Sequence, residues 1–311
     1  MKKSMKVAVS IVTAVSLTFG AGAAASAEES SPDTIGELIA NAPDADQAMG
    51  RPADTSVSIA GDSDGTISFS AEDGSSLSVT LPENAEFTDD AAAEVDQTTL
   101  VTSQYMASGV AGDAGVSSAR AVLVIPNADA PASYDFDIDA PEGTVAEHRA
   151  DGSITLLRPG TTEDGVQVDT VIATFNAPWA VDANGVSVPT SYSFDGTTLT
   201  QKIDFSAVTA FPVVADPKVD WMGYFVRLTY SKAETRNMRD QGVIIGAIVG
   251  AGAAIAAAAG PAAPAIIAAV YAASTVAVGV IATTASNAVG DGKCLQLDIP
   301  SMYPSIVKCK S

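Results

Sequence analysis

A long run near the C-terminus carries no charged side chain, which leaves few structures open to it. Residues 242–259 are almost wholly apolar, and a second apolar stretch covers 265–289. Between the two stretches, Pro261 and Pro264 must interrupt any helix, because a proline ring cannot donate the backbone hydrogen bond that a helix needs. The pattern predicts two uncharged helices joined by a tight turn, which together form a hydrophobic helical hairpin.

The length of these helices leaves two fates open for the hairpin. The first, Val243–Ala259, has 17 residues, at the lower edge of the roughly 20 that a bilayer crossing needs, and the second has 25. Gly242, Gly246 and Gly250 recur every fourth residue, so one helix face lets a second helix approach closely. The hairpin is therefore expected either to enter a membrane and self-associate through this glycine face, or to be buried in a small globular module.

The N-terminus has the pattern of a secretory signal peptide. Lysines open the chain, an apolar stretch follows from Val7 to Phe19, and the small residues Ala25-Ser26-Ala27 have the spacing of a cleavage site. The apolar stretch is shorter than a typical membrane anchor. Residues 1–27 are therefore predicted to be removed, and the mature chain is expected to be secreted.

Export also permits disulfides, and the chain has two cysteines. Cys294 and Cys309 are predicted to form a structural disulfide that closes a short loop. The chain has two cysteines and one histidine in all, too few for most transition-metal sites or for a cysteine–histidine nucleophile. We therefore expect no metal, no cofactor and no enzymatic activity.

Charge is divided unevenly along the chain. Residues 28–217 hold 32 acidic and 5 basic side chains, a charge of about -27, whereas 218–311 hold 5 acidic and 8 basic ones, about +3. Because neutralising phosphates needs clustered lysine and arginine, the overall charge of -21 argues against nucleic-acid binding. The asymmetry predicts two parts with separate partners.

The acidic part has the pattern of short β-strands. A short helical face, Ile35, Leu38 and Ile39, precedes them, and a helical turn or loop is expected at 91–95. Turn pairs such as Asp151-Gly152 separate apolar stretches that alternate with polar residues. The pattern predicts an antiparallel, sandwich-like domain. Its expected strands are 57–59, 66–69, 77–81, 121–125, 134–138, 154–157, 166–175, 186–194 and 199–205.

Two groups in this domain invite a functional interpretation. Asp135, Asp137 and Asp139 alternate along one strand and suggest either a calcium site or a solvated face whose charge opposes aggregation at a sheet edge, and the second is favoured. His148 lies between two charged residues and is expected at the surface of a polar hairpin. Neither group indicates catalysis, because no partnered nucleophile accompanies the histidine.

Three segments carry a resemblance to a known group of proteins. They are Ala177–Gly185, Leu199–Gln201, and Ala210–Pro217 with its Phe-Pro-Val-Val-Ala-Asp-Pro sequence. Here the chain resembles actinobacterial secreted proteins in which a β-rich N-terminal module ends in such a segment and a small, variable C-terminal module follows. The resemblance implies secretion and a boundary near Pro217, and it implies no catalytic residues.

Local chemistry also suggests a boundary at this point. Pro212 and Pro217 cannot donate ladder hydrogen bonds, and the charge changes sign just beyond them. A linker is therefore expected at 212–218. An aromatic stretch follows it, in which 225–230 is a predicted strand.

A new helix is expected directly after this strand. Ser231 and Glu234 have the spacing of a capping box, in which each side chain accepts a hydrogen bond from the other residue's backbone N–H. Lys232, Arg236 and Arg239 fall in the first turns of this helix, before the uncharged run begins.

The sequence thus predicts an α+β chain with a signal peptide, an acidic β-rich domain and a small helical-hairpin module held by a disulfide. The expected parts are a signal peptide 1–27, a polar segment 28–54, a β-rich domain 55–211, a linker 212–218 and a hairpin module 219–311.

The predicted function is that of a secreted, non-enzymatic, membrane-active or bacteriocin-like protein whose acidic domain keeps the hairpin soluble. Lys232, Arg236 and Arg239 would meet anionic headgroups, and Trp221, Tyr224 and Tyr230 would lie at the membrane interface. The alternative is an extracellular binding or cell-envelope structural protein with the hairpin buried as scaffold. The expected partners are an anionic membrane or a second copy, with no nucleic acid and no small-molecule substrate.

Overall fold

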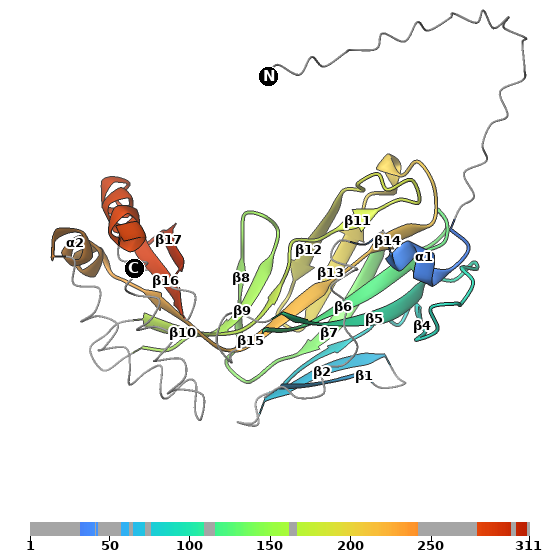
Figure 1. The fold of residues 1–311 in the computed structure, drawn as a ribbon, viewed down its shortest axis with the longest axis horizontal. Helices are drawn as coiled ribbons and strands as arrows, with labels where there is room; N and C mark the ends of the chain where they lie inside the picture. The colour runs from blue at the N-terminus through green and yellow to red at the C-terminus, as the bar shows by residue number, and fades with distance from the viewer. Residues whose placement is uncertain are drawn as a thin grey trace, which may run out of the picture. The chain divides into compact units, whose positions relative to one another are not determined.

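The computed structural model describes residues 32–40, 42, 57–61, 65–71, 76–108, 116–161, 167–241, 279–299 and 303–309 (Figure 1). The predicted signal peptide, 1–27, lies outside the described residues, and so do the three glycines Gly242, Gly246 and Gly250. Within the described residues the chain is mostly antiparallel β-sheet with few helices.

One sheet has six strands, all antiparallel to their neighbours. Its strands alternate apolar and polar residues, so one face of the sheet is buried and the other meets solvent. In spatial order they are β1 (Val57–Gly61), β2 (Thr66–Ala71), β3 (Ser76–Thr80), β7 (Ser133–Asp139), β13 (Thr198–Ile203) and β12 (Thr190–Phe194).

The second and larger sheet is built around the long strands β6 and β15. Its main path is β11 (Ala180–Val181), β14 (Val213–Ala215), β6 (Val116–Ile125), β15 (Lys218–Thr229), β10 (Gln167–Phe175), β9 (Ile154–Arg158) and β8 (Val145–His148). β5 (Leu100–Ser108) also pairs with β6, and β4 (Glu86–Phe87) lies parallel to β5. β16 (Cys294–Ile299) pairs with β15, and β17 (Tyr303–Val307) pairs with β16.

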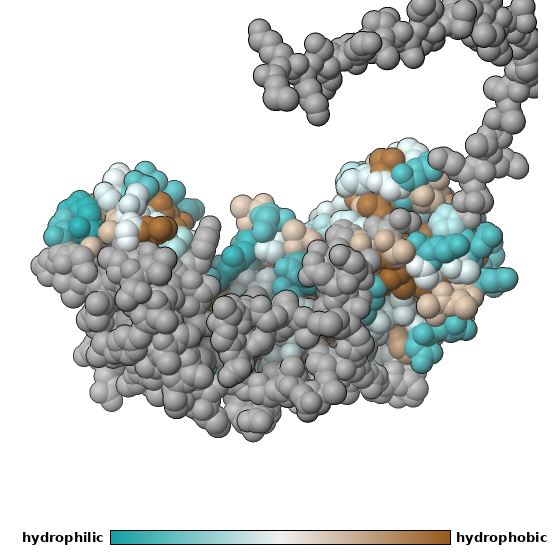
Figure 2. All heavy atoms as spheres, viewed as in Figure 1, coloured by the Kyte–Doolittle hydropathy of each residue, from teal (hydrophilic) through white to brown (hydrophobic). Residues whose placement is uncertain are grey.

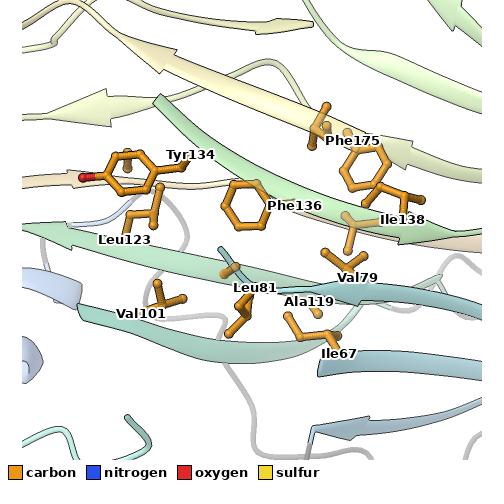
Figure 3. Packing of buried hydrophobic residues seen from close by; sticks show 14 of the residues in the cluster. Ile67, Val79, Leu81, Val101, Ala119, Leu123, Tyr134, Phe136, Ile138 and Phe175 are labelled. Atoms are coloured by element: carbon orange, nitrogen blue, oxygen red, sulfur yellow. The ribbon is translucent and has the colours of Figure 1, made fainter. Parts of the chain in front are cut away.

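The buried faces of the two sheets share one core, as expected for a sandwich-like arrangement. Around Phe136 of β7, the close view in Figure 3 shows apolar side chains from both sheets. The Phe69 ring of β2 stacks on the Trp221 ring of β15 with 5.9 Å between centroids. Burying an aromatic side chain of this size contributes about 1.5–3 kcal/mol, so this contact helps to join the sheets.

The short N-terminal helix was predicted correctly. α1 (Ile35–Ile39) buries Ile35 and Leu38 in a second cluster of apolar residues from the larger sheet. The Glu37 N–H donates to Thr34 Oγ1 at 3.4 Å, so Thr34 caps the helix. Residues 91–92 form a turn, as expected for this loop.

The solvated face predicted for Asp135, Asp137 and Asp139 is also present. Along β7 these three residues are exposed and alternate with buried Tyr134, Phe136 and Ile138. The explanation offered for them was wrong, however. β7 pairs with β3 on one side and β13 on the other, so it is not an edge strand whose charge opposes edge-to-edge pairing.

The structure corrects the linker expected at 212–218. Val213–Ala215 are buried in β14, which pairs with β6, and Lys218 begins the twelve-residue strand β15. Pro217 lies between the two strands, where its missing N–H is tolerated and its carbonyl accepts a hydrogen bond from the Ala121 N–H at 2.9 Å. The chain therefore passes from the acidic part to the C-terminal part inside a sheet.

The C-terminal part also differs from the helical module that was expected. α2 (Lys232–Gln241) is present, residues 279–290 are helical, and β16 and β17 add a hairpin of strands to β15. The rest of the predicted helical hairpin lies outside the described residues. Among the residues that the structure describes, no helix has the length and hydropathy needed to cross a bilayer.

Candidate functional site

The candidate site is the group of elements that flank residues 241–290, a stretch without charged side chains that we call the uncharged run. We call this group of elements the C-terminal frame, and it consists of α2, the helical residues 279–290, β16, β17 and Cys309. Cys294 and Cys309 form the predicted disulfide, which joins the start of β16 to the residue two positions after β17. The predicted pairing of these cysteines is thus confirmed.

The first turn of α2 is fixed to the start of β16. The predicted capping box is confirmed, because the Ser231 N–H donates to Glu234 Oε2 at 2.7 Å and the Glu234 N–H donates to Ser231 Oγ at 3.3 Å. Thr235 is fully buried, and its Oγ1 accepts a hydrogen bond from the Leu295 N–H at 3.1 Å. The Tyr230 N–H donates to the Leu295 carbonyl at 3.0 Å. Leu295 of β16 therefore bonds through its N–H and its carbonyl to two residues at the start of α2, Thr235 and Tyr230.

The helical residues 279–290 reach the same strand from the other direction. They bury Ile281, Ala285 and Ala288, whose spacing places them on one helix face. The helix ends in a turn in which the Lys293 N–H donates to the Ala288 carbonyl at 2.8 Å. Gly292 has φ of 66°, a conformation that favours glycine and ends helices.

The two flanks of the uncharged run thus converge at Cys294 and Leu295. The sequence has no charged residue over 241–290. Before this stretch, Tyr230 and Thr235 are hydrogen-bonded to Leu295 of β16, and after it the chain enters β16 at Cys294.

A buried arginine fixes the other end of β16. Arg227 of β15 makes a bidentate pair with Asp298, with Nε–Oδ1 2.7 Å and Nη2–Oδ2 3.1 Å, and its Nη1 lies 3.3 Å from Glu147 Oε1 of β8. Burial lowers the pKa of Arg227. The hydrogen bonds that Arg227 donates to Asp298, together with the negative charges of Asp298, Glu147 and Asp169, outweigh burial and raise the pKa. The pair locks β16 to the rest of the larger sheet in a charged state.

The three predicted cationic residues lie on α2 and are exposed. Lys232 and Arg236 face solvent, and Arg239 pairs with Asp240 at 2.6 Å. This hydrogen bond raises the pKa of Arg239 and lowers that of Asp240. Figure 2 shows this end of the molecule as hydrophilic where α2 is exposed.

The aromatic residues predicted at a membrane interface are placed differently. Trp221 is 1% exposed and Tyr230 is 2% exposed, and both belong to the buried interior. Burial raises the pKa of the Tyr230 hydroxyl. A sequence does not distinguish a tryptophan or tyrosine at a membrane interface from one in a core, because both places accept an aromatic ring with one polar atom. Here both side chains lie in the core. The side chain of Tyr224 lies outside the described residues.

A second cluster assembles the three segments that carried the resemblance. The Trp179 N–H donates to Asp216 Oδ1 at 3.2 Å, and the Asp216 N–H donates back to the Trp179 carbonyl at 3.2 Å. Gln201 Nε2 donates to the same carbonyl at 3.3 Å. The segments 177–185, 199–201 and 210–217 therefore meet around Asp216. We call this group the Asp216 cluster.

A buried ion pair lies at the centre of the Asp216 cluster. Arg120 Nε is 3.3 Å from Asp216 Oδ2, both side chains are about 3–4% exposed, and the Arg120 guanidinium lies 5.9 Å from the centroid of the Trp179 ring. Burial raises the pKa of Asp216 to about 6, although the charge of Arg120 opposes the shift. Sequence reasoning missed Arg120, which lies in β6, a strand whose residues are buried throughout 117–125. The cluster holds the three segments together.

Two further features lie outside the C-terminal frame and the Asp216 cluster. A cavity of about 410 Å³ beside α1 is lined by Pro32, Asp33, Glu94, Val95, Pro126 and Pro212. His148 is exposed at the end of β8, in the hairpin with β9, as expected. In the described part of the chain, no group of three or more histidine, cysteine or acidic side chains has the arrangement of a metal site.

Comparison with known proteins adds no family. No family model matches the chain, and no curated protein and no solved structure is detectably similar to it. The resemblance to actinobacterial secreted proteins therefore stays a prediction.

Proposed function

We propose that this chain is a secreted, non-enzymatic, membrane-active protein of bacteriocin-like type that delivers its uncharged run to an anionic bilayer. One observation supports the proposal most. The segment before the run without charged residues is hydrogen-bonded to β16, and the segment after the run leads directly into β16, a strand that a disulfide and a buried arginine hold in place. The frame thus brings the two segments that flank the run to one strand.

The roles of the frame residues follow from their exposure. Lys232 and Arg236 are exposed on α2, five or more residues before the uncharged run, and would attract anionic headgroups to its base. Trp221 and Tyr230 have no part in membrane contact, because they are buried. The predicted glycine face would then pack apolar helices against each other inside the bilayer.

The acidic β-rich part has a supporting role in this proposal. Its charge of about -27 keeps the protein soluble and away from anionic surfaces until the frame faces one. Direct attraction between the two parts extends only about 8 Å at physiological salt. Solubility is therefore the main contribution of the acidic part.

Vesicle leakage tests the proposal directly. The oxidised protein should release dye from anionic vesicles and bind neutral vesicles much more weakly. The double variant Lys232→Gln/Arg236→Gln should bind anionic vesicles about 30-fold more weakly, since each basic residue near an anionic surface contributes about 1 kcal/mol. Lys202→Gln is the matched control, because Lys202 is exposed on the six-stranded sheet, away from α2. Equal binding by all three proteins would contradict the proposal.

A second candidate function is favoured by one specific observation. The last part of the second apolar stretch, 281–290, is amphipathic, with Ile281, Ala285 and Ala288 buried while Thr283 and Asn287 are exposed. A helix with a polar outer face is typical of a folded module. This supports an extracellular binding or envelope-structural protein in which the C-terminal run is scaffold.

The variant Gly246→Leu separates the two candidates. A membrane-active hairpin would keep its bilayer binding but lose leakage, because leucine prevents close helix approach. A buried scaffold would instead melt at lower temperature in buffer, since overpacking typically costs about 1–3 kcal/mol. Leakage and melting are measured on the same preparation.

A further inference from the structure

We infer that the Cys294–Cys309 disulfide is a redox latch on the C-terminal frame, which fixes the flanks of the uncharged run when oxidised and loosens them when reduced. The inference rests on the proposed function and adds its regulation. It concerns when the run is presented, whereas the proposed function concerns what the run does.

The latch acts where the two flanks meet. Cys294 is the first residue of β16 and is 1% exposed, and Leu295 beside it bonds to both Thr235 and Tyr230 at the entry to α2. The helical residues 279–290 end four positions before Cys294. A change at Cys294 therefore acts on the start of α2 through the next residue, Leu295, and on the end of the helical residues 279–290 through the short turn before Cys294.

Strand β17 depends on this bond more than the other strands do. Among the described strands it pairs with β16 alone, over five residue pairs, and Cys309 follows two positions later. A strand with a neighbour on one side alone has fewer contacts to hold it than a strand paired on both sides. Closing a loop of 15 residues shifts the opening equilibrium of such a unit about 100-fold. Reduction should release β17 and weaken the start of β16.

No other part of the molecule carries a thiol or disulfide that a thiol reductant could act on. The chain has two cysteines, and both belong to the frame. The far end of β16 is held separately by the Arg227–Asp298 pair. Reduction therefore loosens one end of the frame and leaves the sandwich-like part folded.

The exchange chemistry follows from the exposure of the two residues. Cys309 is partly exposed and Cys294 is buried, so a thiolate of a dithiol reductant attacks Cys309 Sγ. The S–S bond breaks, Cys294 Sγ leaves as a thiolate and takes up a proton, and a mixed disulfide forms at Cys309. The second thiolate of the reductant then attacks the reductant's first sulfur, which is bonded to Cys309 Sγ in the mixed disulfide. This releases Cys309 as a thiol and the reductant as its disulfide, a two-electron exchange.

Through this chemistry, the redox state of the compartment decides whether the C-terminal frame is held by its disulfide. A reducing compartment keeps both cysteines as thiols, whereas an oxidising one, with a disulfide donor that accepts two electrons, forms the bond. The frame would then close only after the export that the N-terminal sequence predicts.

Hydrogen exchange of the full chain tests the latch without relying on activity. On addition of dithiothreitol, the amides around Leu295 and Thr235 should exchange about 100-fold faster. The fluorescence of Trp179 and Trp221, both in the sandwich-like part, should stay constant. The double variant Cys294→Ala/Cys309→Ala should exchange at the reduced rate from the start and respond no further to dithiothreitol, which controls for effects of the reagent.

The outcomes separate the two proposals. Unchanged exchange on reduction overturns the latch, and so does a change in tryptophan fluorescence, because redox would then act on the whole fold. Faster exchange on reduction, with no dye release by the oxidised protein from anionic vesicles, supports the latch and overturns the proposed membrane activity. Faster exchange together with loss of dye release on reduction supports both.

Discussion

Two arginines are buried in the larger sheet, and they are held in different ways. Arg120 in the Asp216 cluster has its ion pair at 3.3 Å with a carboxylate that is itself buried. Arg227 in the frame makes a bidentate pair with Asp298 and also contacts Glu147, and these two side chains are 28% and 36% exposed. One pair is sealed inside the fold, and the other reaches water through its acidic partners.

The difference concerns what each pair does for the fold. A sealed pair makes removal of either partner costly, because an uncompensated charge stays buried. A pair with solvated carboxylates costs less to break, since those carboxylates can turn to water. We infer that the Asp216 cluster is essential to the stability of the acidic part, whereas the Arg227 pair fastens β16 to the larger sheet and is easier to break.

The largest effect is expected for Arg120→Met. Asp216 would lose its cation while staying buried, which should lower the free energy of unfolding by about 3–5 kcal/mol at pH 8. Urea unfolding measures this loss. At pH 5 the loss should be smaller, because a carboxyl with a pKa of about 6 is then largely protonated. A loss that does not depend on pH would contradict the assignment of Asp216 as the buried charge.

Asp216→Asn should change how stability depends on pH. The pKa of Asp216 is about 6 in the folded protein against 3.8 for the free group, so the folded state binds more protons between these values. Its contribution to stability is therefore largest below pH 3.8 and is lost as pH rises to 6 and above. Wild type should lose about 2 kcal/mol relative to Asp216→Asn between pH 4 and pH 7. Parallel curves for the two proteins would show that Asp216 has an ordinary pKa.

Arg227→Met should have a smaller and more local effect. Asp298 and Glu147 can be hydrated once the guanidinium is gone, so we expect a loss of about 2 kcal/mol, below the usual cost of breaking a buried pair. Hydrogen exchange should rise in β16 and remain unchanged in β6. A loss equal to that of Arg120→Met would remove the distinction between the two pairs.

The smallest effect is expected for Ser231→Ala. The variant removes the hydroxyl that accepts the Glu234 N–H, which should lower stability by about 1 kcal/mol. Exchange at the first turn of α2 reports it, and Ser193→Ala on the exposed face of β12 is the matched control. A loss of similar size in the control would mean that the capping box adds nothing to the frame.

Local chemistry made much of this fold predictable. Capping at Ser231 and Glu234, the disulfide, the exposed aspartates of β7 and most strands of the sandwich-like part depend on patterns within a few residues. β5 was missed because its sequence, Leu100–Ser108, mixes polar and apolar residues without regular alternation. β15 was expected to begin at 225, because Pro217 and the change of charge were taken as the end of the domain.

The candidate site was less predictable, because it depends on contacts between distant segments. Nothing near Arg227 in sequence indicates that Asp298 and Glu147, 71 and 80 residues away, will surround it. Trp221 pairs with Phe69 across the core, so its burial depends on a residue 152 positions earlier. Periodicity and turn signals identify elements, but the partners of buried side chains follow from how sheets assemble.

Strand β15 also sets the order in which the molecule can be completed. β6 and β10 are synthesised well before residue 218, and each has an open edge until β15 pairs with both of them. Such edges are templates for pairing with other chains. The acidic part therefore cannot close until the first dozen residues of the C-terminal part have emerged. A growing chain that stopped at Pro217 would be an aggregation hazard, although it would already contain almost every strand of the sandwich.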